Sequence, residues 1–219
     1  MFYNGIITLN DPSLKEFPVR GIDVSSWQGE IDWPVISENM SFAFIKATEG
    51  STFRDEKFQY NFSEANKTNL AVGAYHFLSF ESGGDTQAQN FINTVPINEN
   101  SLPPVIDIEF YGKYNLDPMQ KEKVKPILDE LIDRLEKYYG KKPIIYASYK
   151  TYDLYIKNGY DEKPIWIRDT IKRPVLSDGR KWTFWQYGDR HVMKGYSGKE
   201  RFIDVNVFNG SVNEFYKLF

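Results

Sequence analysis

Two carboxylates stand two residues apart at the end of an apolar run, in the segment Pro-Val-Ile-Asp-Ile-Glu at residues 104–109. If this run is a β-strand, side chains alternate between its faces, so Asp107 and Glu109 point the same way with Cα atoms ~6.6 Å apart. Like charges in a poorly solvated site raise the pKa of one carboxyl, which lets it donate a proton near neutral pH. The spacing favours acid/base chemistry; the alternative is that both groups are solvated or paired with Lys or Arg at a strand end.

Two further carboxylates interrupt apolar segments elsewhere in the chain. Asp23 lies in Gly-Ile-Asp-Val-Ser, and Asp204 lies in Phe-Ile-Asp-Val-Asn. These segments and residues 104–109 are the expected first, eighth and fourth strands. In a closed barrel the first and last strands become neighbours, so we expect all four acids to meet at one rim. Packing alone does not explain such a convergence.

A ring of carboxylates could also hold Mg²⁺ or Ca²⁺ and serve a metal-dependent hydrolase. The sequence has neither the 12-residue calcium loop nor a two-histidine zinc spacing. We therefore expect no metal and no cofactor. Activity that survives EDTA would support this expectation, and loss of activity would support the metal-dependent alternative.

Short apolar runs bounded by turn residues supply the strands that must position these acids. They predict eight strands, several of them hydrophobic on both faces as in covered sheets. The expected strands span residues 19–24, 42–47, 70–77, 104–110, 143–148, 164–168, 182–187 and 202–208.

Helical patterns fill the connections between the first five of these strands. The clearest begins at Asp117-Pro118, has apolar residues at i, i+3, i+4 and i+7 spacing, and can end at Gly140. Pro126 inside it predicts a kink or a break. Other helices are expected over residues 32–38, 56–68 and 85–95, with a short one at most over 152–158.

The last three connections change character, because the segments 169–181 and 188–201 contain Pro and Gly without a helical period. Parallel crossovers usually need a helix, so some of these strands should be antiparallel. The pattern predicts an α/β fold: five βα units followed by three strands, closed into a TIM-like (β/α)5(β)3 barrel of eight strands in a single domain. Chemistry in such barrels lies at the carboxyl ends of the strands.

Five segments in order resemble the motifs of glycoside hydrolase family 25, the Chalaropsis-type lysozymes. These are Asp-Val-Ser-Ser-Trp-Gln-Gly (23–29), Phe-Ile-Lys-Ala-Thr-Glu-Gly (44–50), Gly-Ala-Tyr-His-Phe (73–77), Asp-Ile-Glu (107–109) and Asp-Val-Asn-Val-Phe (204–208). The resemblance spans residues 19–208. It implies an N-acetylmuramidase that cleaves the β-1,4 bond between N-acetylmuramic acid and N-acetylglucosamine in peptidoglycan.

By the same resemblance, Glu109 matches the general acid, Asp107 its partner, and Asp23 and Asp204 the remaining active-site carboxylates. Two mechanisms stay open: a carboxylate nucleophile, or attack by the 2-acetamido oxygen of the substrate while Asp107 orients its N–H. We favour the second. A glycan-binding protein without activity on the same fold is a further alternative, because the presence of the acids is not activity.

Aromatic residues on the expected strands can supply flat floors for sugar rings, which present apolar C–H faces. The aromatic content is high, with Trp 5, Tyr 15 and Phe 16. The candidates for substrate binding are Tyr75, Tyr146, Trp166, Trp185 and Tyr187. For each of them barrel packing is the alternative role.

Other aromatic and charged residues are assigned by their place in the pattern. Trp27 and Trp182 are expected to pack. Lys46 and Glu49 close the second strand, either as a surface ion pair or as a pair that neutralises the acids and contacts substrate. We expect His76 to point away from Tyr75 toward the helices, His191 to be solvated, and Arg168-Asp169 to end the sixth strand.

Composition excludes several classes of protein. The net charge is −3, Cys is absent, and no basic cluster exceeds Lys141-Lys142, so nucleic acid is not an expected partner. No apolar run approaches the ~18 residues of a membrane span. The expected partner is a peptidoglycan glycan strand, and the expected state is a monomer.

The ends of the chain leave two questions open. The first residues have no signal-peptide pattern, so we expect either another export route or a leader already removed for an enzyme that acts on cell walls. The expected division is an extension of unknown role at residues 1–18 and a catalytic domain at 19–219.

Overall fold

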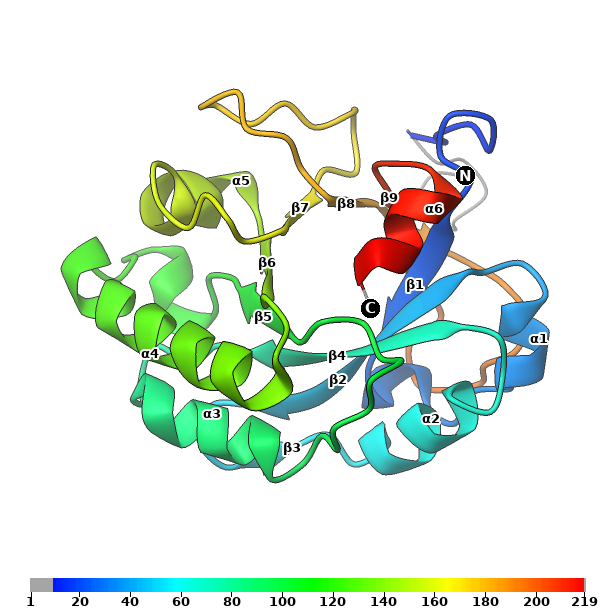
Figure 1. Cartoon of the computed structure of the whole chain (residues 1–219), viewed down its shortest axis with the longest axis horizontal. Helices are drawn as coiled ribbons and strands as arrows, with labels where there is room; N and C mark the ends of the chain where they lie inside the picture. Colours follow the sequence, from blue (N-terminus) through cyan, green and yellow to red (C-terminus); the bar gives the residue numbers. More distant parts are fainter. Residues whose placement is uncertain (1–9, 219) are drawn as a thin grey trace.

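Eight strands close into a barrel in the computed structural model, which describes residues 10–218 (Figure 1). The barrel strands are β1 (Arg20–Val24), β2 (Phe42–Glu49), β4 (Ala71–Phe77), β5 (Val105–Ile108), β6 (Ile144–Ala147), β7 (Ile165–Arg168), β8 (Phe184–His191) and β9 (Ile203–Phe208). The pairing of β1 with β2 and of β1 with β9 closes the ring. The two-residue strand β3 (Phe53–Arg54) only extends β2 as a hairpin. The eight-stranded α/β barrel is therefore confirmed.

Helices follow the first five barrel strands and are missing between the last three. They are α1 (Trp33–Ser37), α2 (Phe58–Ala65), α3 (Gly84–Ile92), α4 (Lys121–Tyr139), and α5 (Tyr149–Thr151) continued by a π-helix (Tyr152–Ile156). Figure 1 shows α1 to α5 arranged in an arc along one side of the strands. All neighbouring barrel strands are parallel except β9, which is antiparallel to both β8 and β1. The predicted five βα units are thus present, and of the last three strands only β9 is antiparallel to its neighbours.

The long helix α4 differs from its prediction at two points. It begins at Lys121 after Gln120, not at Asp117-Pro118, and it runs through Pro126 without a break. Pro126 lies only in the second turn, where the missing N–H removes a single backbone hydrogen bond. An apolar stripe of buried residues holds the helix against the barrel: Val124, Leu128, Leu131, Ile132 and Leu135. Gly140 ends it with φ 68°, as predicted.

Aromatic rings fill the barrel interior. Phe42, Phe44, Phe184 and Phe208 pack against one another with centroids 5.3–5.6 Å apart. Phe215 of the short helix α6 (Val212–Phe215) packs on Phe42 and Phe208 and closes the end of the barrel where the parallel strands begin.

Two glycines make room for these rings. A Cβ on Gly21 would lie 2.4 Å from the Phe42 ring, and one on Gly73 would lie 2.6 Å from the Phe44 ring. Because side chains alternate, the inward direction of Gly21 and Gly73 also fixes Asp23 and Tyr75, two residues further on, toward the interior. The interior is therefore apolar and aromatic where the parallel strands begin, and its polar inward residues come at the opposite end.

A second apolar layer lies between the strands and the helices, and the N-terminal part of the described chain joins it. Phe17 packs on Trp182 and Trp185, with centroid distances of 5.9 Å for both. The expected extension at residues 1–18 is described only from residue 10, and residues 1–9 lie outside the described residues.

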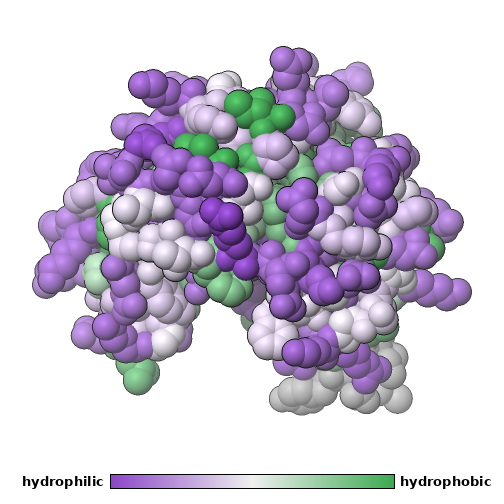
Figure 2. Space-filling view, turned by 90° about the horizontal axis from the view of Figure 1, so that it is seen from below, coloured by the Kyte–Doolittle hydropathy of each residue, from purple (hydrophilic) through white to green (hydrophobic). Residues whose placement is uncertain are grey.

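The face seen in Figure 2 is mostly hydrophilic and is hollowed by a notch. Among residues 10–218, no helix has the length and apolarity of a membrane span.

Candidate active site

A cavity of about 100 Å³ opens at the carboxyl ends of the parallel strands. We call it the acid cavity; it is lined by Asp23, Tyr75, Asp107, Glu109, Tyr146, Trp166, Gln186 and Asp204. Asp23 and Asp204 stand directly opposite each other in the β1–β9 register. The structure therefore brings together all four acids that the sequence placed at one rim.

Two buried amides hold the Asp23 carboxylate. Gln186 Nε2 and Asn206 Nδ2 both donate to Asp23 Oδ2, at 2.9 and 2.7 Å. The amide oxygens are in turn bonded, since Tyr146 Oη donates to Gln186 Oε1 and Trp166 Nε1 donates to Asn206 Oδ1, both at 2.9 Å. The indole N–H can only donate, so it fixes the Asn206 amide with its NH₂ toward Asp23. This network orients the carboxylate.

Burial raises the pKa of both acids in the Asp23–Asp204 pair. For Asp204 the rise is large, and the neighbouring Asp23 charge adds to it. For Asp23, the hydrogen bonds from Asn206 and Gln186 offset part of the increase in pKa. The interaction between the two carboxyls lowers the pKa of Asp23 and raises that of Asp204. Asp23 is therefore the member of the pair that loses its proton more readily.

Asp107 and Glu109 form the second pair, and both favour the protonated form more than a solvated acid does. Burial raises the pKa of Asp107 well above its usual range, and the Glu109 charge adds to this. Burial also raises the pKa of Glu109, while the Arg168 guanidinium opposes the rise. Asp107 Oδ1 is buried and has no hydrogen-bond partner among residues 10–218. This unused acceptor thus belongs to a residue that lines the same cavity as Glu109.

Lys46 and Glu49 lie beside the acid cavity but do not line it. Lys46 Nζ is bonded to Glu49 Oε2 at 2.8 Å and lies 5.1 Å from the centre of the Phe77 ring. The Lys46 charge lowers the pKa of Asp107, against the larger effect of burial. The pair is thus an ion pair at the rim whose cation partly neutralises the acids.

Three of the five predicted aromatic residues line the cavity, and two do not. Tyr75, Tyr146 and Trp166 are lining residues. Trp185 and Tyr187, expected at the rim, are a correction: both are buried in the layer outside the barrel. Trp185 Nε1 donates to the Asp169 carbonyl at 2.8 Å, and Tyr187 Oη accepts from Arg20 at 3.4 Å.

The residue between these two aromatics is the one that points inward. Gln186 lines the acid cavity, and Asn206 supports it, although neither was a candidate from the sequence. The available signal was alternation, because Asn206 lies two residues after Asp204 on the same strand face.

Trp27 is also a correction: it was expected to pack, yet it is 63% exposed.

The remaining histidine and arginine candidates lie either between the barrel and the helices or at the ends of the strands. His76 points to the helices as predicted, bonded to Thr48 Oγ1 at 2.7 Å and Gln87 Oε1 at 3.0 Å, and burial lowers its pKa to about 4. His191, expected to be solvated, is half-buried against the Tyr187 ring, and burial lowers its pKa. Arg168 forms an ion pair with Asp189 at 2.5 Å.

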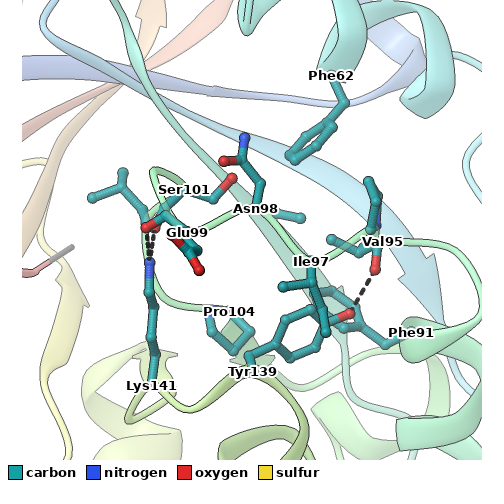
Figure 3. Close-up of a pocket in the computed structure, with 13 residues that line it drawn as sticks. Phe62, Phe91, Val95, Ile97, Asn98, Glu99, Ser101, Pro104, Tyr139 and Lys141 are labelled. Atoms are coloured by element: carbon teal, nitrogen blue, oxygen red, sulfur yellow. Dashed lines mark hydrogen bonds between the residues drawn. The ribbon is translucent and has the colours of Figure 1, made fainter.

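A separate cavity lies away from these four acids. Figure 3 shows a cavity of about 260 Å³ beside α2 and α3, near the starts of β5 and β6. There Tyr139 donates to the Val95 carbonyl at 2.8 Å, and Lys141 donates to the carbonyls of Glu99 and Ser101 at 2.7 and 2.6 Å. Its lining is mostly apolar. Among residues 10–218, no group of three or more His, Cys, Asp or Glu side chains is arranged to hold a metal ion.

A (β/α) barrel with paired carboxylates of raised pKa at the carboxyl ends of its strands has the features of a glycoside hydrolase. The comparison with known proteins agrees, because residues 22–196 match the family model described as glycosyl hydrolases family 25. The chain belongs to this family.

Similar proteins have the same architecture. The chain is similar to a family 25 glycosyl hydrolase structure from Bacillus anthracis, with 52% identity, a TM-score of 0.89, and coverage of 94% of this chain and 95% of that chain. It is similar to a bacterial lysozyme structure from Streptomyces coelicolor, with 31% identity, a TM-score of 0.78, and coverage of 91% and 96%. It is also 34% identical over 207 residues to Lysozyme M1 of Streptomyces globisporus, covering 88% of this chain and 68% of that protein.

Proposed function

We propose that this chain is a muramidase that cleaves the β-1,4 bond between N-acetylmuramic acid and N-acetylglucosamine in peptidoglycan, with Glu109 as general acid and base. Family membership and the lysozyme relatives support the substrate class. The observation that carries the proposal is the pairing of Glu109, whose pKa is raised by burial, with the unpartnered Oδ1 of Asp107 in one cavity.

The first step breaks the glycosidic bond. Glu109 donates its proton to the glycosidic oxygen, which leaves with the bonding electron pair. The carbonyl oxygen of the 2-acetamido group supplies the electron pair of a new bond to C1 in the same step. The product is a cyclic oxazolinium ion with one positive charge. Substrate assistance of this kind is an established exception to the two-carboxylate scheme.

The second step restores both the enzyme and the acetamido group. The Glu109 carboxylate takes a proton from water as the water oxygen bonds to C1, and the C1–O bond to the acetamido oxygen breaks. The proton returns Glu109 to its acid form. The product has the same anomeric configuration as the substrate, because C1 is inverted twice.

Asp107 is suited to the acetamido group through its free acceptor. An acetamido N–H can donate to Asp107 Oδ1, which has no hydrogen-bond partner in the described part of the chain. Positive charge develops on the acetamido group during the reaction, and this charge stabilises the anionic form of Asp107. The cavity without substrate has no such charge. The oriented Asp23 carboxylate contributes further negative charge near the reacting sugar.

Digestion of purified peptidoglycan tests the activity and the acid together. The wild type should release fragments with muramic acid at the reducing end, identified by mass analysis. Glu109→Gln should lower kcat about 10²–10⁴-fold, because general acid catalysis contributes that much, and should still bind the glycan. Asn115→Asp, an exposed change outside the cavity, serves as the control.

Three outcomes would contradict the proposal. Near-full activity of Glu109→Gln removes the assigned acid, and glucosamine reducing ends indicate a different bond. Binding without any release of reducing ends indicates a glycan-binding protein.

Strands with de-N-acetylated muramic acid test substrate assistance. They lack the acetamido oxygen, so their cleavage by the wild type should fall to the level of Glu109→Gln, measured as new reducing ends. Binding of these strands to Glu109→Gln is the control for lost affinity. Cleavage of bound, de-N-acetylated strands at the normal rate would instead indicate a carboxylate nucleophile.

A further inference from the structure

Trp27 lies at the outer edge of a groove that continues from the acid cavity. This inner groove has a volume of about 610 Å³ and shares Asp23, Tyr75 and Asp204 with the acid cavity. Trp27 also lines a second hollow of about 350 Å³, the outer groove, whose other sides include Phe53 and Lys199. The indole therefore separates two adjoining hollows, each within the usual size range of ligand sites.

The Trp27 indole is exposed, but the backbone beneath it is firmly held. Trp27 sits in a 3-10 helix (Ser26–Gln28), in which Ser26 N donates to Asp55 Oδ2 at 2.9 Å. Gln28 Nε2 donates to the Phe202 carbonyl at 3.0 Å, and the Trp27 carbonyl accepts from Glu200 N at 3.0 Å. A backbone that is already rigid loses less conformational entropy when a ligand binds, so the exposed Trp27 ring is preorganised for binding.

Close packing of the neighbouring loop adds to this rigidity. A Cβ on Gly198 would lie 2.2 Å from the Trp27 carbonyl oxygen, so only glycine allows the loop to approach this far. Phe53, 49% exposed on β3, faces the same outer groove. Two exposed aromatic side chains beside a groove of polar and charged residues are the pattern of a binding surface, not of packing.

We propose that Trp27 is the platform of a distal sugar subsite, over which the glycan strand passes from the acid cavity into the outer groove. This inference rests on the proposed muramidase function. An indole presents a flat apolar face that fits the C–H face of a pyranose ring, while the polar groups of the groove can bond the ring hydroxyls. The continuity of the inner groove with the acid cavity identifies the occupant as the strand being cleaved.

The test compares glycan strands of two lengths, both freed of stem peptides: the shortest strand that the wild type cleaves and strands at least twice as long. On long strands, Trp27→Ala should raise KM about tenfold, the equivalent of ~1.4 kcal/mol, with kcat within about twofold of the wild type. On the shortest strand its KM and kcat should match those of the wild type. Trp27→Phe, which keeps a flat ring, should recover most of the affinity for long strands.

The control is Tyr60→Ala, which removes an exposed ring on α2 that lines neither groove and should leave both KM values unchanged. Unchanged KM of Trp27→Ala on long strands would overturn the proposal. So would an equal loss on both lengths, which would show a structural role, or a failure of Trp27→Phe to restore affinity. If the wild type released no muramic reducing ends from any strand, the proposed function itself would fail, which is a separate result.

Discussion

Arg168 is the cation that most directly opposes the raised pKa of Glu109. It projects from the end of β7 and forms an ion pair with Asp189, which leaves it half-buried beside the acids. Its charge lowers the pKa of Glu109 and also that of Asp204. A general acid works best with a pKa near the working pH, so Arg168 acts on the pH range of the reaction rather than on the reacting atoms.

Replacing Arg168 with Gln should therefore extend activity to higher pH. Without the guanidinium the pKa of Glu109 rises, so Glu109 stays protonated further into the alkaline range. The alkaline limb of the kcat/KM profile should move upward in pH when measured as released reducing ends. Arg173→Gln, which removes an exposed arginine paired with Glu16, should leave the limb in place. A limb that stays or moves downward in Arg168→Gln would refute this role.

At the scale of strands and helices, the apolar runs were sufficient to predict the barrel. The sequence did not determine which face of a strand turned inward wherever both faces were hydrophobic. In β8, Trp185 and Tyr187 looked more suited to a sugar site than Gln186, but the barrel register turns Gln186 inward. Period-2 patterns cannot distinguish the faces of a strand that is covered on both sides.

The acids were easier to place than the aromatics, because a carboxylate within an apolar strand is costly to bury without a function. Asp23, Asp107 and Asp204 stood out on that ground. The exposed position of Trp27 had no such signal, since it depends on a short 3-10 turn held by Asp55 and the loop at Gly198. Those partners are far away in the sequence, and local patterns do not report such contacts.

At the scale of the whole molecule, the acid cavity lowers the free energy of unfolding at neutral pH. Asp107 is buried, and its raised pKa means that the folded chain holds this proton more tightly than the unfolded chain does. The stabilisation linked to this proton is complete below the usual Asp value of 3.8 and is lost as pH rises through the folded-state pKa. An enzyme site that destabilises its own fold in this way is a common compromise.

Asp107→Asn should consequently raise the melting temperature at pH 7. The amide has no charge to bury, so a gain of about 1 kcal/mol corresponds to roughly 2–4 °C at this chain length. The difference from the wild type should shrink as the pH is lowered and vanish below the usual Asp value of 3.8, where Asp107 is protonated in both states. Calorimetry across this pH range makes the measurement, with the exposed Asp117→Asn as control. An equal or lower melting temperature at pH 7 would contradict the assigned cost.

The pairing of β1 with β9 also determines when the site can exist during synthesis. Asp23 and Asn206, which are hydrogen-bonded at 2.7 Å, are 183 residues apart. Until the last strand leaves the ribosome, β1 and β8 are both open edges, which are prone to pairing with other chains. The final strand and the Phe215 that follows it seal the barrel. Because Asp204 arrives with that strand, a nascent chain is spared the repulsion of the full acid cluster until the step that completes the fold.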